Sequence, residues 1–207
     1  MLCLVIGYFC GCLLTAEFVA RSVGGKSAFL LGTGNPGTAN IMRLFGTKWA
    51  AVTLLGDLAK TFFACLICRL VLFPDLGGLA VLYAGVGVSL GHGFPFWHRL
   101  RGGRSVAVTC AYIVIFSPTW GLGADIAGMC IVFASRYLAA GALAIPSLFL
   151  IPTFLFFGPE AGTVMLAGTA VTFALHRDSI SRILSGEEGR TPSFSSLTAR
   201  LRHGGGK

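Results

Sequence analysis

The stretch GLAVLYAGVGVSLGHGFPFW, residues 78–97, is followed directly by HRLRGGR, residues 98–104. The first segment carries no Asp, Glu, Lys or Arg. A helix needs about 20 mainly apolar residues to cross a hydrocarbon core of about 30 Å. The second segment contains three arginines, and Lys and Arg accumulate in the cytoplasmic loops next to membrane spans. The stretch therefore predicts a transmembrane helix whose C-terminal end faces the cytoplasm.

The same pattern of apolar run and break recurs along the whole chain. Short breaks without Lys or Arg alternate with segments rich in Arg, Lys and Gly. When the runs are threaded back and forth, all 16 Lys and Arg residues except Lys60 and Arg69 fall on one side. We therefore expect an all-α integral membrane protein of about seven transmembrane helices, with its N-terminus outside and its C-terminus cytoplasmic. The apolar runs lie at about 1–20, 49–72, 78–97, 105–121, 123–140, 142–158 and 160–176.

The composition excludes an ordinary soluble domain. Of the 207 residues, 55% are hydrophobic and 12% are charged, and the mean hydropathy is +0.79, whereas a soluble domain carries about 25% charged residues. A net charge of +8 is common in nucleic-acid-binding domains. Here the cations lie in membrane loops, so we expect no nucleic-acid partner. The 7 cysteines all lie in apolar runs and are expected to be free thiols.

Several boundaries follow from the distribution of charge and of turn-forming residues. The first cation, Arg21, comes after the first apolar run, the reverse of a signal peptide, so we expect a retained first helix. We predict a membrane domain over residues 1–184 and a flexible basic cytoplasmic tail over residues 185–207. A short turn is expected around residues 117–123, and a tight hairpin of small residues at Ala139–Gly141.

The most informative loop is GTGNPGTAN, residues 32–40. Its glycines free the backbone, so that N–H groups can converge on an anion. Arg43 follows shortly after and can bind phosphate with two parallel hydrogen bonds. The segment therefore indicates a phosphate-binding loop, although a loop of this composition is also common as an ordinary turn. Its short polar side chains are those of Thr33, Asn35, Thr38 and Asn40.

Two further segments place glycine or histidine beside cations at the predicted cytoplasmic surface. The first joins GHGFP, residues 91–95, to GGRS, residues 102–105; taken alone, it is also consistent with an ordinary positive-inside loop. In the second, the last span leaves the membrane, and helical spacing places His176, Ser179 and Arg182 near one face. Both segments are candidates for anion binding.

Ionisable residues also occur inside the second predicted span. Asp57 lies eight residues after Trp49, about 12 Å along a helix, and Lys60 follows one turn later. Ionised groups at such depth cost roughly 2.5–3.5 kcal/mol each, so they are expected to face the bundle interior and to pair. Two interpretations remain open: a purely structural pair, or a pair that supports a polar site.

The acidic and histidine residues limit the chemistry. The 8 Asp and Glu residues are scattered, so we expect no Mg²⁺ cluster, no other metal and no cofactor. Acyl transfer by a His-x-x-x-x-Asp motif needs an Asp five positions after a histidine. After His92, His98 and His176 that position holds Trp97, Gly103 and Ser181. A His–Asp base of that kind is therefore excluded.

In motif order and in number of spans, the chain resembles the bacterial acyl-phosphate:glycerol-3-phosphate acyltransferases, the PlsY family, over nearly its whole length. The matching motifs are Gly32 to Arg43, Asp57 with Lys60, Gly91-His92-x-x-Pro95, Gly102 to Ser105, Arg136-Tyr137 and His176 to Arg182. Departures from the family's motifs include four substitutions. The family's Ser, Lys, Gly and Asn are replaced here by Thr33, Arg104, Ser105 and Ser179.

The resemblance implies transfer of a fatty acyl group from acyl phosphate to the 1-hydroxyl of glycerol 3-phosphate, giving lysophosphatidate for phospholipid synthesis. It implies an enzyme of the bacterial cytoplasmic (inner) membrane, with its active site facing the cytoplasm and without metal or cofactor. The implied catalytic residues are Thr33, Asn35 and His176. The implied phosphate-binding residues are Gly34, Asn40, Arg43, Gly102, Gly103, Arg104, Ser179 and Arg182. The implied supporting residues are Asp57, Lys60, His92 and Arg136.

Two alternatives to this function stay open. One is a sibling enzyme with an altered donor or acceptor, suggested by the substitutions at Arg104, Ser105 and Ser179. The other is an anion transporter or a non-catalytic membrane protein, which the few charged residues inside the spans disfavour. Besides the two substrates we expect membrane lipid as a partner. We expect a monomer, with a weak homo-oligomer or a complex of lipid-synthesis enzymes as alternatives.

Overall fold

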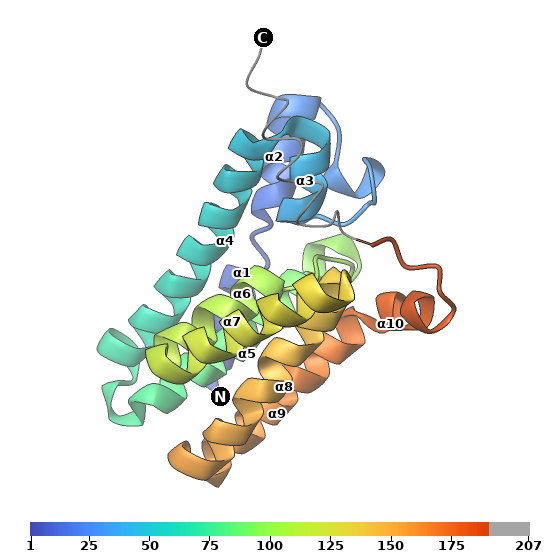
Figure 1. Ribbon diagram of the computed structural model, residues 1–207. Coiled ribbons are helices and arrows are strands. Elements are labelled where there is room, and N and C mark those ends of the chain that lie inside the picture. Colours follow the sequence, from blue (N-terminus) through green and yellow to red (C-terminus); the bar gives the residue numbers. More distant parts are fainter. Residues whose placement is uncertain (191–207) are drawn as a thin grey trace, which may run out of the picture.

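The computed structural model describes residues 1–190 and shows a bundle of α-helices (Figure 1). The helices are α1 (Leu2–Gly11), α2 (Thr15–Gly24), α3 (Thr38–Phe45), α4 (Thr47–Ile67), α5 (Gly78–Gly93), α6 (Val106–Phe116), α7 (Pro118–Ser135), α8 (Leu138–Phe157), α9 (Pro159–Leu175) and α10 (Arg177–Leu184). Short helical turns are η1 (Ala28–Leu30), η2 (Cys68–Leu72), η3 (Pro74–Leu76) and η4 (Phe96–His98). The regular structure of the described residues is therefore all helical.

Helix α5 forms the centre of the bundle and packs against α1, α4, α6 and α9. Its closest neighbour is α1, because glycines on both helices let the backbones touch. A Cβ atom on Gly7 of α1 would collide with the carbonyl of Ala84, and one on Gly91 of α5 with the carbonyl of Tyr8. Small residues at four-residue spacing are typical of close helix packing inside membranes.

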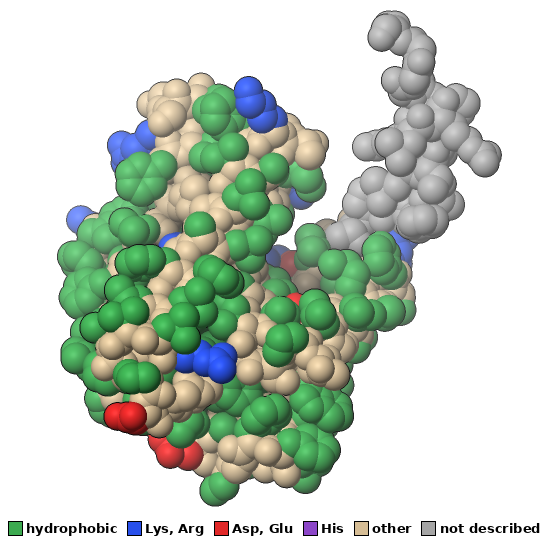
Figure 2. Space-filling model, turned by 90° about the vertical axis from the view of Figure 1, so that its left-hand side faces the viewer, with side chains coloured by type: hydrophobic (Ala, Val, Ile, Leu, Met, Phe, Trp, Pro, Cys, Tyr) green, Lys and Arg blue, Asp and Glu red, His purple; other side chains and the backbone are tan. Residues whose placement is uncertain are grey.

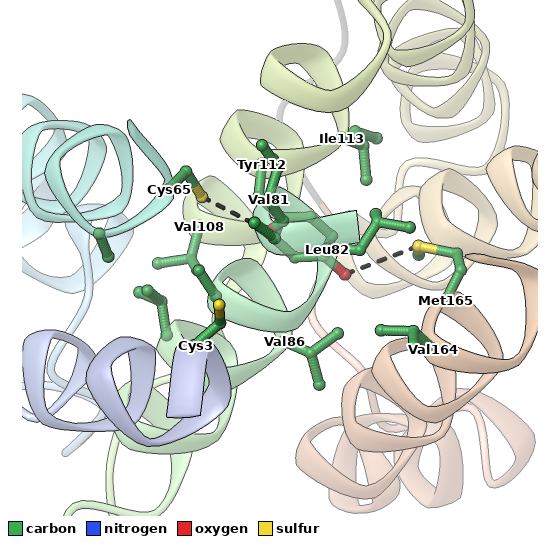
Figure 3. Close-up of a cluster of buried hydrophobic side chains, with 14 of the residues drawn as sticks. Cys3, Cys65, Val81, Leu82, Val86, Val108, Tyr112, Ile113, Val164 and Met165 are labelled. Atoms are coloured by element: carbon green, nitrogen blue, oxygen red, sulfur yellow. Dashed lines mark hydrogen bonds between the residues drawn. The ribbon is translucent and has the colours of Figure 1, made fainter. Parts of the chain in front are cut away.

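The apolar core joins α1, α4, α5, α6 and α9 (Figure 3). Tyr112 of α6 is fully buried at its centre, and its hydroxyl donates a hydrogen bond to Sδ of Met165 on α9 at 3.8 Å. The thiol of Cys65 on α4 donates to the carbonyl of Val81 on α5 at 3.6 Å. The hydroxyl of Tyr112 and the thiol of Cys65 thus find their partners within the bundle, where lipid offers none.

The outer surface of the bundle is apolar enough to require lipid. The described residues contain four helical segments long and apolar enough to cross a membrane: Leu2–Gly24, Thr47–Leu72, Gly78–His98 and Leu138–Phe157. Hydrophobic side chains spread over most of the face in Figure 2, several Lys and Arg residues lie in its upper part, and acidic side chains stand out at its lower edge. The prediction of an all-helical membrane protein with multiple spans is therefore confirmed.

The first apolar run is not one continuous helix, contrary to the prediction for residues 1–20. Helix α1 ends at Gly11, Leu14 has an extended backbone (φ −92°, ψ 99°), and α2 begins at Thr15. A break inside a membrane protein leaves backbone carbonyls that need donors from elsewhere in the protein. Lys60 Nζ supplies such a donor to the carbonyl of Leu13.

The turn predicted around residues 117–123 is shorter than expected. Helix α6 ends at Phe116 and α7 begins at Pro118, so that Gly121 and Gly123 lie inside α7. Proline suits the first helical position because its fixed φ matches the helix and its missing N–H would have no partner there. Helix α6 has 11 residues and is about 16 Å long, shorter than the run over 105–121 predicts.

The hairpin predicted at Ala139–Gly141 is wrong. Helix α7 ends at Ser135, Arg136 adopts a left-handed conformation (φ 64°), and α8 begins at Leu138. Gly141 instead lies in α8 and faces α7, where an added Cβ would collide with the side chain of Val132. The small residues at this position serve close helix packing rather than a turn.

The segment between the first two predicted spans and the C-terminal segment are also structured. Residues 21–48 contain η1 and α3. Helix α10 ends at Leu184, and of the predicted tail 185–207 only residues 185–190 lie in the described part of the chain. Arg190 lies over the ring of Tyr137 at 5.7 Å, so these residues run from α10 toward the α7–α8 turn.

Candidate active site

Three of the predicted site residues form a buried triad, namely Asp57 and Lys60 on α4 and His92 on α5. Lys60 Nζ lies 2.8 Å from Asp57 Oδ1 and 2.8 Å from His92 Nδ1, and His92 Nδ1 lies 3.7 Å from Asp57 Oδ1. An ammonium group only donates hydrogen bonds, so His92 Nδ1 accepts one and the proton of the neutral ring is on Nε2. The triad thus fixes the orientation of the histidine ring.

The triad also closes the break between α1 and α2. Lys60 Nζ donates to the carbonyl of Leu13 at 2.7 Å, and the hydroxyl of Thr15 donates to Asp57 Oδ1 at 3.4 Å. The carbonyls at the end of a helix have no partner within that helix. The ion pair of α4 therefore satisfies backbone groups that the helix break exposes.

The glycine pair predicted to bind phosphate rests on the triad. The N–H of Gly103 donates to the carbonyl of His92 at 2.9 Å. A Cβ atom on Gly102 would collide with this carbonyl, and one on Gly103 with Nε2 of the His92 ring. Only glycine allows the loop to approach so closely, and this approach sets the position of Arg104, the next residue.

Ser105 follows in a conformation that favours glycine. Its φ is 57°, in the left-handed region that non-glycine residues enter at a cost. Its hydroxyl donates to the carbonyl of Ser89 on α5 at 2.8 Å. A local hydrogen bond thus offsets part of the strain that serine introduces where the PlsY motif has glycine.

A second group, the cationic cluster, consists of Arg104, His176, Ser179 and Arg182. Nη2 of Arg182 donates to the hydroxyl of Ser179 at 3.0 Å, so these two residues share a face of α10. His176, directly before α10, and Ser179 are almost completely buried. Arg182 Nε lies 2.6 Å from Oε2 of Glu188. A carboxylate from the turn after α10 therefore contacts the cluster.

Electrostatics link the members of this cluster. Partial burial lowers the pKa of the Arg104 guanidinium, an effect that Glu188 opposes and Arg182 reinforces. Burial acts to raise the pKa of the Glu188 carboxyl, but hydrogen bonds from Arg182 and Ser179 and the charge of Arg104 outweigh it and hold that pKa below its usual range. The three charged groups thus lie close enough to influence one another, and the site favours an anion.

His176 lies at the junction of α9 and α10, and one of its ring nitrogens makes a hydrogen bond to the backbone. Its Nδ1 is 2.9 Å from the carbonyl of Thr172. A carbonyl only accepts, so Nδ1 carries the proton and Nε2 of the neutral ring has a lone pair. This tautomer equips Nε2 to accept a hydrogen bond from a hydroxyl group.

Hydrogen bonds between its own residues and Leu31 set the conformation of the glycine loop, residues 32–40. Asn40 is buried; its Oδ1 accepts from the N–H of Thr33 at 3.0 Å, and its Nδ2 donates to the carbonyl of Leu31 at 3.0 Å. Gly34 has a φ of 71°, and the N–H of Asn35 donates to the hydroxyl of Thr33 at 3.4 Å. Both polar groups of the Asn40 amide are thus used to close the loop.

Contacts outside the predicted site hold this loop beside the segment that carries η4. Glu17 of α2 accepts from the N–H of Ala28 at 2.8 Å. The ring of Phe29 stacks on His98 at a centroid distance of 3.6 Å, and Trp97 Nε1 donates to the carbonyl of Cys12 at 2.8 Å. The glycine loop and the 96–105 segment therefore lie at the same end of the bundle.

A cavity of about 260 Å³ opens beside these contacts. It lies at the break between α1 and α2. Its lining consists of Cys12, Leu13, Leu14, Glu17, Phe18, Arg21 and Trp97. Most of these side chains are apolar, and the Glu17–Arg21 ion pair, with 2.6 Å between Oε1 and Nε, provides the polar wall. The cavity is therefore mainly apolar, with one charged wall.

Two further predicted residues lie on other elements. Arg43 is exposed on α3. Arg136 forms the α7–α8 turn, where its N–H donates to the carbonyl of Val132 at 2.7 Å. Within the described residues no cluster of three His, Cys, Asp or Glu side chains has the geometry of a metal site.

Two acidic residues that act at these sites were not among the predicted site residues. The carboxylate of Glu17 holds the start of η1. Glu188 was assigned to the flexible tail, yet its carboxylate binds Arg182. The sequence signal for Glu188 is a Gly-Glu-Glu-Gly turn directly after a short amphipathic helix.

Comparisons with known proteins identify the family. The family model described as glycerol-3-phosphate acyltransferase matches residues 1–186. The chain is 38% identical to glycerol-3-phosphate acyltransferase 1 of Lactobacillus johnsonii, covering 96% of this chain and 95% of that protein. It is 34% identical to the glycerol-3-phosphate acyltransferase of Bordetella pertussis, covering 90% of this chain and 89% of that protein.

Solved structures give the same fold. The crystal structure of PlsY (YgiH), an integral membrane glycerol 3-phosphate acyltransferase, in its glycerol 3-phosphate form matches with a TM-score of 0.82 at 23% sequence identity. The match covers 95% of this chain and 97% of that chain. The lysphosphatidic acid form of the same protein gives a TM-score of 0.81. The resemblance to the PlsY family is thus confirmed, and the chain belongs to the glycerol-3-phosphate acyltransferase family.

Proposed function

We propose that this glycerol-3-phosphate acyltransferase takes its acyl group from acyl phosphate, transfers it to the 1-hydroxyl of glycerol 3-phosphate, and releases inorganic phosphate and lysophosphatidate for phospholipid synthesis. The observation that carries the proposal is the cationic cluster. The charge of Arg182 lowers the pKa of the Arg104 guanidinium, so the two cations lie near each other, and Arg182 donates to the hydroxyl of Ser179 at 3.0 Å. Donor and acceptor both bear phosphate, and arginine is suited to binding it.

The residues of the site take separate roles in this proposal. Arg104, Ser179 and Arg182 bind the phosphate of glycerol 3-phosphate, together with the backbone of Gly102 and Gly103. The glycine loop binds the donor. There, Thr33 and Asn35 contact the reacting acyl phosphate, and Gly34 and Arg43 contact its phosphate group. The Asn40 amide is used within the loop, and this favours an indirect role for Asn40 through loop shape.

The proposed reaction needs little covalent help from the protein. Acyl phosphate is a mixed anhydride, so the hydroxyl oxygen attacks the carbonyl carbon and the bond from this carbon to the phosphate oxygen breaks. Placing the two reactants together and stabilising the negative charge are the main tasks. The hydroxyl proton goes either to His176 Nε2, whose lone pair the hydrogen bond to Thr172 leaves available, or to the departing phosphate.

The buried triad and Arg136 support this site from outside it. Asp57 and Lys60 orient His92, and His92 receives the backbone of Gly103. Arg136 shapes the α7–α8 turn. The donor's alkyl chain lies between helices, and the mainly apolar cavity at the break between α1 and α2 offers room for part of it.

We further propose seven membrane crossings, with the N-terminus outside and the active site on the cytoplasmic side of the bacterial inner membrane. The first crossing is α1 with α2, and α4 to α9 supply the other six. Residues 1–184 form the membrane acyltransferase domain and residues 185–207 a basic tail. The one-sided cations of the sequence support this topology, and reporter fusions at the C-terminus test it.

A sibling reaction with another donor or acceptor is the second candidate. It is favoured by Ser105, whose positive φ occupies a position where the PlsY motif has glycine. Arg104 also offers a different geometry from lysine, because its planar fork makes paired hydrogen bonds. An assay with several phosphorylated acceptors separates the two candidates.

The deciding experiment supplies palmitoyl phosphate and glycerol 3-phosphate to the detergent-purified chain, without added metal. We expect lysophosphatidate to form, and palmitoyl-CoA in place of palmitoyl phosphate to give none. Absence of lysophosphatidate, under conditions in which a known PlsY enzyme turns over, contradicts the proposal. Equal turnover with palmitoyl-CoA contradicts the assignment of the donor.

A further inference from the structure

The carboxylate of Glu188 lies among the groups that the proposed function assigns to the substrate's phosphate. Its Oε2 is 2.6 Å from Nε of Arg182, and its side chain is only 14% exposed. The family model matches residues 1–186, so this carboxylate lies just beyond the matched stretch. The motifs that define the family therefore do not account for it.

A tight turn after α10 brings this side chain back onto the helix. Gly186 has a φ of 74°, a conformation that glycine adopts without strain. The N–H groups of Glu187 and Glu188 both donate to the carbonyl of Arg182, at 2.8 and 3.0 Å. Glu187 is exposed, whereas Glu188 points back to the guanidinium group. The turn therefore places the carboxylate of Glu188, and not that of Glu187, against Arg182.

A carboxylate and a phosphate make the same demands on an arginine. Both bind through charge-assisted hydrogen bonds to the guanidinium N–H groups. Nη2 of Arg182 already contacts the hydroxyl of Ser179 at 3.0 Å, and Nε contacts Glu188. An N–H group that holds Glu188 is not available to a phosphate oxygen. Two anions in the same place would also repel each other strongly.

We propose that Glu188 is an internal competitor of the substrate: its carboxylate occupies part of the phosphate site when the site is empty and leaves when glycerol 3-phosphate binds. This inference rests on the proposed function, in which Arg104, Ser179 and Arg182 bind that phosphate. The residue then determines the apparent affinity for the acceptor. It keeps the arginines paired between turnovers and raises the concentration of glycerol 3-phosphate that the enzyme needs.

The test compares Glu188→Gln with Glu187→Gln in the detergent-purified full-length chain. Both changes remove one negative charge from the same turn, but only the first removes the ion pair with Arg182. For Glu188→Gln we expect the KM for glycerol 3-phosphate to fall about two- to fivefold, as loss of one competing, partly exposed ion pair implies. The inhibition constant of inorganic phosphate should fall by the same factor, with kcat within about twofold. For Glu187→Gln we expect wild-type constants.

Other results overturn the inference. Unchanged constants in Glu188→Gln show that the carboxylate does not compete, and a higher KM or a much lower kcat shows that it orients Arg182 for catalysis instead. Thermal unfolding in detergent checks that both variants are folded. Glu188→Ala, which offers no amide to Arg182, should shift KM and the inhibition constant in the same direction as Glu188→Gln.

Failure of this inference is distinguishable from failure of the proposed function. Binding of inorganic phosphate, measured by calorimetry, needs no turnover. If the wild-type chain makes no lysophosphatidate, the proposed function fails, while tighter phosphate binding by Glu188→Gln than by Glu187→Gln still supports competition. If the wild-type chain is active and the two variants bind phosphate equally, only the competitor role fails.

Discussion

The buried triad and the cationic cluster both contain cations beside a carboxylate, but they differ in how completely their hydrogen bonds are used. In the triad, Lys60 is surrounded by Asp57, His92 and a backbone carbonyl, all inside the bundle. In the cluster, Arg182 is partly exposed, and the carboxylate that pairs with it comes from the turn after α10. A buried network in which every hydrogen bond is made stabilises the fold. A network that includes one side chain able to move away can exchange that side chain for a ligand.

The largest loss of stability is expected when the triad loses its cation. Lys60→Met leaves Asp57 buried without its cation and should destabilise the chain by about 3–5 kcal/mol, seen as a large fall in the thermal unfolding temperature in detergent. Lys48→Met, at the exposed start of α4, is the matched control and should change it little. Combining Asp57→Asn with Lys60→Met should recover part of the loss. A stable Lys60→Met variant would show that the triad is not structural.

The next effect separates binding from folding in the cluster. Arg182→Gln should raise the KM for glycerol 3-phosphate roughly ten- to a hundredfold, because a hydrogen bond to a charged group contributes about 1.5–3 kcal/mol. Its unfolding temperature should stay near that of the wild type. Arg177→Gln, an exposed arginine on the same helix, is the control and should keep wild-type kinetics. If both variants behave alike, α10 does not contribute to the phosphate site.

A smaller effect tests the connection between the two regions. Gly103→Ala places a Cβ against the His92 ring and must shift the loop that carries Arg104. We expect kcat/KM to fall about tenfold, within the range of a hundredfold that a displacement of about 1 Å can cost. Gly123→Ala, where the added Cβ meets open space, is the control. Unchanged kinetics for Gly103→Ala would mean that the triad does not position Arg104.

The smallest effect concerns the strain at Ser105. Ser105→Gly and Ser105→Ala both lose the hydrogen bond to Ser89, but only glycine relieves the positive φ. The glycine variant should therefore be about 1 kcal/mol more stable than the alanine variant in thermal unfolding. Equal stability of the two variants would contradict the left-handed conformation at this position.

The sequence predicted best those features that lipid imposes. The runs at 49–72, 78–97 and 142–158 agree closely with Thr47–Leu72, Gly78–His98 and Leu138–Phe157, because a membrane span needs a continuous apolar stretch. The family was also predictable, since its motifs consist of glycines and polar residues at fixed spacing. Both predictions depend on local sequence.

The features that depend on contacts between distant segments were not predictable in this way. Hydropathy did not detect the break at Cys12–Leu14, because the donor that stabilises it, Lys60, lies on another helix. The small residues at Ala139–Gly141 were taken for a turn, although small residues also mark close helix packing.

The same distinction applies to the site. His176, Ser179 and Arg182 were grouped by helical spacing, and in the structure a hydrogen bond joins Ser179 to Arg182. Glu188 was missed because its contact requires the chain to reverse after α10. Asn40 was assigned to phosphate, but the amide closes its own loop, which no spacing rule reveals.

The cationic cluster is proposed as the phosphate site for glycerol 3-phosphate. This role can be measured as the dissociation constant of glycerol 3-phosphate, determined by calorimetry on the detergent-purified chain without donor, for the wild type and for Arg104→Gln. We expect Arg104→Gln to weaken binding about tenfold or more, as loss of a charge-assisted contact implies, with the unfolding temperature preserved. An unchanged dissociation constant in a folded Arg104→Gln variant would contradict the claim.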